Sequence, residues 1–560
     1  MPGLVPGIHV LRPRHEKDVD GRDKPDHDEV HDLTMLGRIL TVGGYTLVSR
    51  LTGFMRDIML AAILGAGPVA DAFFVAFRLP NHFRAIFAEG AFNAAFVPAY
   101  ARISASGGPA PAGLFADRIF TLLLAVEAVL LAVALIFTPT VIEWLAPGFS
   151  HDPQRFTLAV ELTRITFPYL LLISLVTLYG GILNALHRFA AAAAAPILLN
   201  FAMMATLALV FLFPSAGHAA AWGVLISGVL QALLVGADAR RNKVLPRFHA
   251  FALDDDVKRF FRALGPATLG SGGTQIALFA DTIIASFLTA GALSALYYAD
   301  RLNQLPIGVI GIAAGTVLLP EMASRIAAGD EAGAHHSQNR AIEFTLLLAI
   351  PCVAAFLIVP DLIMRALFAH GAFTRADAAA AGATLAAYTI GLVPFVLLRS
   401  VSATFLARGD TATPVKALLI SVVINVALKI LLMHDYAQVG LAFATSVGVW
   451  INFGLIVWFA RRAGLIGLDD RLKRSIAKLA VAGLVLAAAL YGGAHLLARL
   501  FAGLPAFRSE LTLAALTLIG GIVYGGALAL LFGREWLATL RLRRGDAAPV
   551  MPPDAGAPPA

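Results

Sequence analysis

Long apolar runs alternate with short polar connections along most of the chain from Leu36 onward. A helix needs about 20 residues to cross a hydrocarbon core of about 30 Å. The pattern therefore predicts about fourteen transmembrane helices and an all-α polytopic membrane protein. The predicted spans are 36–64, 70–102, 117–146, 156–187, 193–213, 218–238, 260–289, 293–325, 338–368, 377–407, 413–434, 437–460, 474–500 and 509–532.

The polar segments divide the apolar runs into groups. Residues 1–34 and 534–560 are rich in charge or proline and show no apolar stripe, so both are predicted to be disordered. Residues 35–238 are expected to form a first lobe of six helices, and residues 260–460 a second. A basic linker, 239–259, joins them, and two further helices follow within 461–533.

A weak internal repeat relates the two lobes. DIMLAAILGAG from Asp57 matches DTIIASFLTAG from Asp281, and AFFVAFRL from Ala72 matches ALYYADRL from Ala295 after a slip of one residue. Six predicted spans separate the copies, so equivalent helices cross the membrane in the same direction. Parallel repeats of this kind are typical of transporters whose substrate site lies between two lobes.

Composition and charge narrow the class further. Hydrophobic residues make up 58% of the 560 and charged residues only 14%, against about 25% charged in soluble domains, which excludes an ordinary soluble enzyme. The net charge of +7 does not indicate binding of nucleic acid, because Lys and Arg gather in every second connection between the predicted spans. That distribution predicts that both termini are cytoplasmic. Cys352 is the single cysteine, so a disulfide within the chain is excluded.

The first two spans carry an unusual density of charge. An ionisable side chain inside a membrane costs about 2.5–3.5 kcal/mol on insertion scales, so it normally serves a bundle interior or a cavity. Gly53 and Pro80 allow these helices to bend or break between their charged residues. The charged residues are Arg50, Arg56 and Asp57 in the first span and Asp71, Arg78, Arg84 and Glu89 in the second.

The eighth span repeats this theme with Asp300 and Arg301 ahead of Pro306. Arg301 is the repeat counterpart of Arg78. An enclosure lined mainly by arginine suits an anion, above all a phosphate or pyrophosphate, because guanidinium offers paired donors. The alternative is structural: Arg78 with Asp300 or Glu89 can be a fixed strut between helices.

No enzyme signature accompanies these charges. The chain has no G-x-x-x-x-G-K-[ST] loop, no H-E-x-x-H and no G-x-S-x-G at a strand-to-helix turn. We therefore expect a transporter without a cofactor or metal, driven by an ion gradient or the membrane potential. A cation site is conceivable around Asp281 and Asn425, but Lys429 one turn later can supply that charge itself, which argues against sodium.

Two motifs resemble the start of the MurJ/MviN family, the bacterial lipid II flippases: SRLTGFMRDIMLAAILGAG (49–67) and ADAFFVAFRLPNHFRAIFAEGAFNAAFVP (70–98). The resemblance continues through YYADRLNQLPIGVIGIAAGTVLLP (297–320) and extends over about residues 36–530. It implies the multidrug/oligosaccharidyl-lipid/polysaccharide exporter fold. It also implies that the last two helices form a groove for the polyprenyl tail of the substrate.

The resemblance further implies roles for individual residues. Arg50, Arg56, Arg84 and Arg301 match the family arginines that receive the lipid-linked diphosphate. Asp71 and Asp300 match family acids, and Gln304 departs from a Glu present in some relatives. The expected partners are lipid II, membrane lipids and the cell-wall synthesis machinery, with no nucleic acid and with the chain active as a monomer. The expected location is the bacterial inner membrane.

Other functions predict different features. A cation-coupled multidrug exporter of the same fold needs a cavity acid and an apolar or cationic ligand, which the arginine excess disfavours. An exporter of the same fold that carries another polyprenyl-linked oligosaccharide remains an alternative. A polytopic glycosyltransferase needs a catalytic acid or base on a sizeable loop, and the loops here are short. A cell-division scaffold needs no intramembrane charge.

Overall fold

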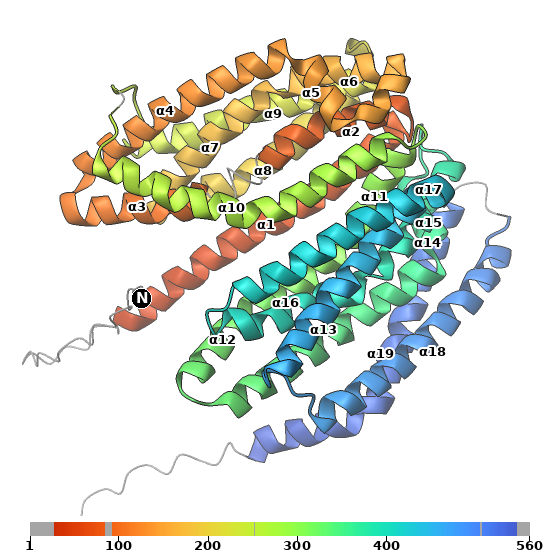
Figure 1. Cartoon of the computed structure of the whole chain (residues 1–560). Coiled ribbons are helices and arrows are strands. Elements are labelled where there is room, and N and C mark those ends of the chain that lie inside the picture. Colours follow the sequence, from red (N-terminus) through yellow and green to blue (C-terminus); the bar gives the residue numbers. More distant parts are fainter. Residues whose placement is uncertain (1–26, 84–91, 251, 504–506, 546–560) are drawn as a thin grey trace, which may run out of the picture.

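The chain folds into two helical lobes with a further pair of helices beside the second lobe (Figure 1). This computed structural model describes residues 27–83, 92–250, 252–503 and 507–545. Within these ranges the secondary structure is helical and no strand is present. The predicted all-α class is therefore confirmed.

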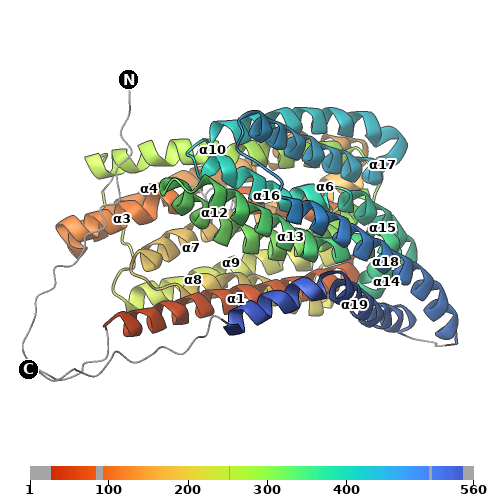
Figure 2. The same ribbon diagram turned by 90° about the horizontal axis from the view of Figure 1, so that it is seen from below.

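In the described residues, the first lobe, called the N-lobe, comprises nine α-helices, and many of them pack on helices distant in the chain, as α2 does on α6 and α7 does on α9. Its most extensive packing is between α8 and α9, and α1 lies along α8 (Figure 2). The elements are α1 (His27–Leu64), α2 (Pro68–Phe83), α3 (Phe92–Gly107), α4 (Pro109–Ile136), α5 (Thr138–Leu145), η2 (Pro147–His151), α6 (Pro153–Thr166), α7 (Pro168–Ala185), α8 (Ala190–Ala208), η3 (Val210–Leu212) and α9 (Ala216–Arg241).

The second lobe, called the C-lobe, follows the connection after α9. Its first helix, α10, packs against α3 and α4 of the N-lobe and against α17 of its own lobe. The elements are α10 (Asp255–Ser286), α11 (Ala292–Pro306), the π-helical segment η4 (Ile307–Gly311), α12 (Ile312–Ala327), α13 (Glu331–Ile358), α14 (Pro360–Phe368), α15 (Arg375–Thr389), α16 (Leu392–Leu406) and α17 (Ala412–Arg462).

Two final helices, α18 (Asp470–Leu500) and α19 (Arg508–Gly545), lie on the side of the C-lobe that faces away from the N-lobe (Figure 1). Tyr524 of α19 donates a hydrogen bond to the carbonyl oxygen of Leu347 in α13 (2.8 Å). At the start of α18, Arg340 of α13 forms an ion pair with Asp469 (2.6 Å). These contacts attach the helix pair to the C-lobe.

Prolines divide several predicted spans into two helices. Span 156–187 breaks at Phe167 before Pro168, and span 338–368 breaks at Val359 before Pro360. Span 293–325 passes through the π-helical segment directly after Pro306. Proline lacks the amide hydrogen and clashes with the preceding turn, so each break falls where the sequence removes a helical hydrogen bond.

The count of fourteen spans is not confirmed. Nine helical segments of the described residues are long and apolar enough to cross a membrane. Spans 36–64, 70–102, 260–289 and 293–325 are missing from these nine. The two spans 413–434 and 437–460 form one helix, α17, which is interrupted only by the non-helical backbone of Ala437. Charge in α1, and the shortness of α2, α3, α11 and α12, explain most of the difference.

The chain ends also differ from the prediction. Helix α1 begins at His27 and α19 continues to Gly545. Helix therefore extends into both segments, 1–34 and 534–560, that the sequence predicted to be disordered. Good helix formers such as Glu, Leu and Arg in these stretches favour this continuation.

The repeat appears in space as a pseudo-two-fold relationship between α2 and α11. The rings of Phe74 and Tyr297 occupy equivalent repeat positions, and they stack with centroids 3.9 Å apart. Asp71 and Ser294 are equivalent too, and the Ser294 hydroxyl donates to Asp71 (2.6 Å). Contact between equivalent residues places both pairs close to the axis that relates the lobes.

Candidate functional site between the lobes

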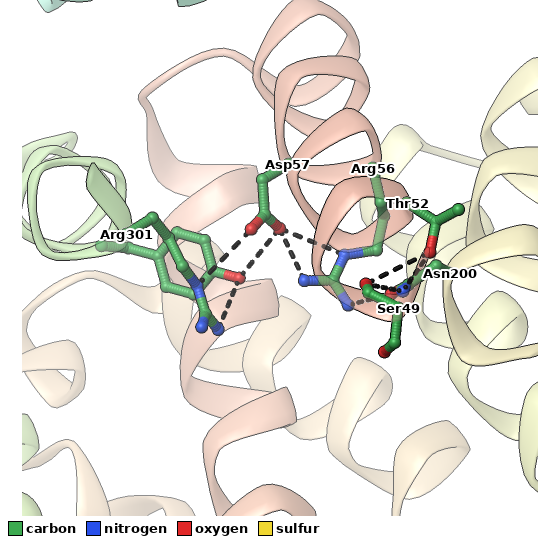
Figure 3. A network of polar contacts seen from close by, with 7 residues as sticks. Ser49, Thr52, Arg56, Asp57, Asn200 and Arg301 are labelled. Atoms are coloured by element: carbon green, nitrogen blue, oxygen red, sulfur yellow. Dashed lines mark hydrogen bonds and ion pairs between the residues drawn. The ribbon is translucent and has the colours of Figure 1, made fainter. Parts of the chain in front are cut away.

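A polar network joins α1, α8 and α11 at the junction of the lobes (Figure 3). Its centre is Asp57, whose side chain is only 4% exposed. The guanidinium of Arg56 donates to Asp57 from Nε and Nη2 (3.1 and 2.7 Å) and from Nη1 to the Asn200 side chain (3.0 Å). The amide nitrogen of Asn200 donates in turn to the Ser49 carbonyl (3.0 Å) and the Thr52 hydroxyl (2.9 Å).

The C-lobe reaches this network through Arg301 and Tyr297. Arg301 Nε lies 3.6 Å from the second Asp57 oxygen, and its Nη2 donates to the Tyr297 hydroxyl (3.1 Å). Tyr297 also donates to Asp57 (3.3 Å), and the Arg301 guanidinium lies over the Tyr297 ring at 4.7 Å. One carboxylate thus holds an arginine from each lobe. The Arg301 side chain is 29% exposed, so it stays more accessible than Arg56 at 8%.

Arg50 takes a different position from Arg56. It is exposed, and its guanidinium packs against Gly308 of η4, where a Cβ atom would lie 2.3 Å from Nη1. Gly311 in the same π-helical segment packs against Arg399 of α16. Gly308 follows Arg301 by two helical turns, about 10 Å along the axis. Arginines from α1, α11 and α16 therefore line one stretch of the α11–η4 element.

The six-residue spacing of Arg50 and Arg56 explains why they part. Helix α1 continues through Gly53, so the two side chains point to different sides of the same helix. The sequence prediction named a bend at Gly53 as one way to bring them together. Gly53 instead leaves room for Asn200, because a Cβ there would lie 3.4 Å from the Asn200 amide nitrogen.

A second charged group lies between α2, α10, α11 and α17. Lys429, which is 2% exposed, forms an ion pair with Asp281. Asp300 is hydrogen-bonded by Gln304 and interacts electrostatically with Arg78 and Asp281. Asn425 lies one turn from Lys429, and its amide nitrogen donates to the Ala444 carbonyl (3.4 Å). Lys429 is thus the cationic partner of Asp281, as the sequence suggested.

A third group closes one end of the lobe interface, the end formed by the α1–α2 and α10–α11 turns. The buried carboxylate of Asp71 accepts from the backbone nitrogens of Gly291 (2.8 Å) and Ser294 (2.9 Å) at the start of α11. Arg155 of α6 donates to the same carboxylate (3.2 Å) and to the Leu288 carbonyl (3.3 Å). A carboxylate of the N-lobe therefore caps a helix of the C-lobe, where the helix dipole favours negative charge.

The backbones of the lobes also touch at this closed end. A Cβ on Gly148 would lie 2.3 Å from the Ser286 carbonyl oxygen, and a Cβ on Gly371 would lie 2.3 Å from the Ala62 carbonyl oxygen. Ala62 and Ser286 occupy equivalent positions of the repeat. The two contacts are therefore reciprocal, and each works only with a glycine on one side.

The opposite end of the interface is different. In the middle turns of α1, the side chains of Leu47, Val48 and Leu51 are 60%, 43% and 63% exposed. The exposed Arg50 belongs to these middle turns, while the residues of α1 near Ala62 pack against the C-lobe. The lobes thus meet near the end of α1 and leave its earlier turns uncovered.

The sequence prediction and the structure overlap in part. The three groups contain nine of the predicted residues, and Arg50 lies apart from them beside η4, whereas Arg84 and Glu89 lie outside the described residues; the nine are Arg56, Asp57, Arg301, Asp71, Arg78, Asp300, Asp281, Asn425 and Lys429. Sequence reasoning missed Asn200, Tyr297, Ser294 and Arg155. An amide inside the apolar run PILLNFAMM is the one signal that singles out Asn200, while Arg155 looks like an ordinary loop residue in the sequence.

The chemistry of the site is that of a cationic binding surface. Within the described ranges, the cations Arg50, Arg56, Arg78, Arg301 and Lys429 outnumber the neighbouring carboxylates of Asp57, Asp281 and Asp300. Among the described residues, no group of three or more His, Cys, Asp or Glu side chains is arranged to hold a metal ion. Two related helical lobes that share buried charge across their interface define the class of multi-pass membrane transporters.

Comparison with known proteins identifies the family. A family model described as "Lipid II flippase MurJ" matches residues 60–509. A probable lipid II flippase MurJ of Rhizobium meliloti is 40% identical over 528 residues, which cover 92% of this chain and 98% of that protein. The lipid II flippase MurJ of Burkholderia cenocepacia is 34% identical over 466 residues, with coverages of 82% and 90%. The chain belongs to the lipid II flippase MurJ family, and it is therefore a transporter and not an enzyme.

Solved structures agree on the fold. The structure titled "Lipid II flippase MurJ, inward closed conformation" superposes with a TM-score of 0.75 at 24% identity, covering 89% of this chain and 99% of that one. An inward-facing multidrug resistance MATE family transporter of the MOP superfamily gives a TM-score of 0.62 at 16% identity, with coverages of 76% and 98%. The exporter fold expected from the sequence motifs is confirmed.

Proposed function

We propose that this chain moves lipid II, the undecaprenyl-pyrophosphate-linked precursor of peptidoglycan, from the inner to the outer leaflet of the bacterial inner membrane. Family membership and the multi-pass helical fold support the substrate and the location. One observation supports the site: a single buried carboxylate, Asp57, is shared by an arginine from each lobe. Such an arrangement suits an anionic group that takes over the arginines when it binds.

The diphosphate of the substrate is the group that would make this exchange. Arg301 and Arg50 are both accessible, and their guanidinium groups offer paired donors to phosphate oxygens. When phosphate replaces Asp57 as the partner of Arg301, the link between the lobes passes through the substrate. The carboxylate keeps Arg56 and the Tyr297 hydroxyl as partners, so it is not left alone in a desolvated site.

Alternating access follows from the closed end. With both termini in the cytoplasm, the closed end faces the periplasm and the uncovered turns of α1 around Arg50 lie on the cytoplasmic side of it. This conformation receives substrate from the inner leaflet. Opening towards the periplasm requires breaking the Asp71 cap on α11 and the glycine contacts at Gly148 and Gly371. The polyprenyl tail stays outside the lobes, along α18 and α19.

The driving force is assigned to the membrane potential or an ion gradient other than sodium. The ammonium of Lys429 is bound to Asp281 and is buried, so it occupies the place of a cation. A charge that crosses the membrane field gains about 2.3 kcal/mol per 100 mV. The chain is proposed to act as a monomer that delivers its substrate to the cell-wall synthesis machinery.

In-cell flipping of lipid II tests the proposal. In a strain that depends on this chain, the fraction of lipid II exposed on the outer leaflet is measured for Arg301→Ala, Arg50→Ala and the control Arg461→Ala, which changes an exposed arginine at the end of α17. We expect loss of outer-leaflet lipid II for the first two and no change for the control. Wild-type flipping in both variants, or accumulation of a different lipid-linked oligosaccharide, would contradict the assignment.

A further inference from the structure

An apolar groove on the outer side of the N-lobe contains a carboxyl group that the transport site does not use. The groove has a volume of about 500 Å³, and it runs between α4, α7 and α10 with α5 at one end. Helix α4 lies at the outer edge of the N-lobe (Figure 1), away from the network on α1, α8 and α11. The volume falls within the range of pockets that hold small molecules.

The groove opens sideways to lipid. Helix α4 contains the most apolar stretch of all candidate spans among the described residues. Two of its lining side chains, Val126 and Leu130, are 48% and 52% exposed on the surface beside the groove. A ligand therefore enters from the bilayer, and it must itself be soluble in lipid.

Glu127 is the one ionisable side chain among the described lining residues. It is 7% exposed, and its Oε1 accepts a hydrogen bond from the Ser174 hydroxyl (3.0 Å). Thr177, the third polar lining residue, donates instead to the Ile173 carbonyl of its own helix (2.9 Å). Within the described part of the chain, no residue donates to Glu127 Oε2.

Such a carboxyl is costly unless something pairs with it. An acid within a membrane span costs more than about 2 kcal/mol on insertion scales, and buried ionisable groups normally have a partner. A second Ser, a backbone amide or an Arg is what a purely structural role would provide, and the other side chains that line the groove are apolar apart from Ser174 and Thr177. The missing partner is a hydrogen-bond donor or a positive charge carried by the ligand.

We propose that this groove, called the Glu127 groove, binds a lipophilic amine: a molecule with an apolar chain and one basic nitrogen. The apolar chain of the amine packs against Leu123, Leu130 and Phe261, and the nitrogen of the amine contacts Oε2 of Glu127. On binding, the carboxyl proton moves to the amine nitrogen, so an ammonium pairs with a carboxylate and no net charge enters the membrane.

Occupancy of the groove would also affect α10. Phe260, Phe261 and Leu264 line the groove from this helix, whose start is tied to α3 and α4 by the ion pairs Arg102–Asp256 and Arg118–Asp254. The apolar chain of a bound amine adds contacts between α10 and the N-lobe on the side of α10 that lines the groove. The amine therefore favours the arrangement in which the start of α10 rests on the N-lobe.

Binding of N,N-dimethyldodecylamine to the full chain in lipid nanodiscs tests the proposal. Tritiated amine is measured by scintillation proximity, with the signal of empty nanodiscs subtracted. We expect one saturable site per chain, at least tenfold weaker binding to Glu127→Gln, and no competition by 1-dodecanol, which has the same chain without the basic nitrogen. Glu143→Gln, which removes an exposed acid of α5 outside the groove, should bind as the wild type does.

A second variant separates loss of the site from loss of the fold. Val126→Trp fills the groove from its exposed edge without changing Glu127, and it should also abolish saturable binding. The unfolding temperature and lipid II flipping of each variant show whether the protein is intact. Equal binding to wild type and Glu127→Gln, equal competition by 1-dodecanol, or no signal above empty nanodiscs would each overturn the proposal.

Discussion

Phe74 of α2 and Tyr297 of α11 stack with their ring centroids 3.9 Å apart, although they are equivalent residues of two halves of the chain. Tyr297 uses its hydroxyl to contact Asp57 and Arg301, whereas Phe74 has no hydroxyl. The repeat is therefore symmetric in packing and asymmetric in polarity. The polar network with one carboxylate and two arginines forms on one side of the axis.

Asp57→Asn should disrupt the network and the protein's stability together. The neutral amide leaves Arg56 and Arg301 without a shared counter-ion in a buried site, and removing one partner of a buried pair typically costs about 3–5 kcal/mol. We expect a clear fall in unfolding temperature in detergent and at least a tenfold loss of lipid II flipping. Asp435→Asn, at an acid of α17 remote from the network, serves as the control. Unchanged stability of Asp57→Asn would refute a central role for this carboxylate.

Asp71→Asn should weaken the closed end of the interface. The variant loses the charge in its bonds to Arg155, Gly291 and Ser294, and hydrogen bonds to a charged group contribute about 1.5–3 kcal/mol each. We expect a shift towards structures opened at that end, with longer distances between spin labels at positions 150 and 289 in double electron–electron resonance.

These labels lie on different lobes at exposed positions. Cys352 is the only cysteine of the sequence, and it is replaced before the labels are introduced. Ser294→Ala should give a smaller shift, because it removes one hydroxyl donor and leaves the backbone nitrogen of Ser294 bonded to Asp71. The same distance distribution in Asp71→Asn and wild type would show that the cap does not hold this end closed.

Gly148→Ala and Gly371→Ala should block closure. Each added methyl group would sit 2.3 Å from a carbonyl oxygen of the other lobe, and Gly371 also has a positive φ of 58°. We expect both variants to reach the membrane and to lose lipid II flipping by at least tenfold. Gly67→Ala is the matched control, since a methyl group added there would have no atom within 4 Å. Normal flipping by either variant would mean that this close approach is dispensable.

Lys429→Met and Asp281→Asn should be coupled in a double-mutant cycle. Each single substitution leaves the other charge without its ion-pair partner, while the double variant removes both charges. We expect the double variant to be more stable than the sum of the single changes by about 1–3 kcal/mol, as measured by thermal unfolding.

Sodium dependence gives a further readout of the same pair. With Lys429 in place, replacing sodium by potassium should leave flipping unchanged. In the double-mutant cycle, purely additive effects of Lys429→Met and Asp281→Asn would show that the two residues do not stabilise the protein as a pair. Flipping that stops without sodium would show that Lys429 does not take the place of a bound cation.

How far the sequence predicted this molecule depends on the kind of feature. Apolar runs located nearly every helix, because burial in lipid requires about 20 apolar residues whatever the tertiary structure. The repeat and the charges within the spans pointed to α1, α2 and α11, which carry much of the candidate site. The division into helices was less accurate, since α17 continues through two predicted spans and only the backbone of Ala437 marks their border.

The hydrogen-bond and ion-pair partners of the charged residues could not be predicted from the sequence. Asp71 looked like one more cavity acid, and only the folded chain brings it to the start of α11, 220 residues away at Gly291. Arg56 was grouped with Arg50, yet packing against Asn200 buries one guanidinium while the other stays exposed. Side-chain pairing across lobes depends on the angle between helices, which no local pattern contains.

The attachment of α18 and α19 has a mechanical consequence. Their contacts through Tyr524 and Asp469 run to α13, so the pair moves with the C-lobe as one rigid body when the lobes tilt. A lipid chain lying against them would be dragged sideways by one lobe while its head group is held by both. Friction between tail and bilayer then opposes the swing of the C-lobe, and the rate of reorientation should depend on the viscosity of the surrounding lipid.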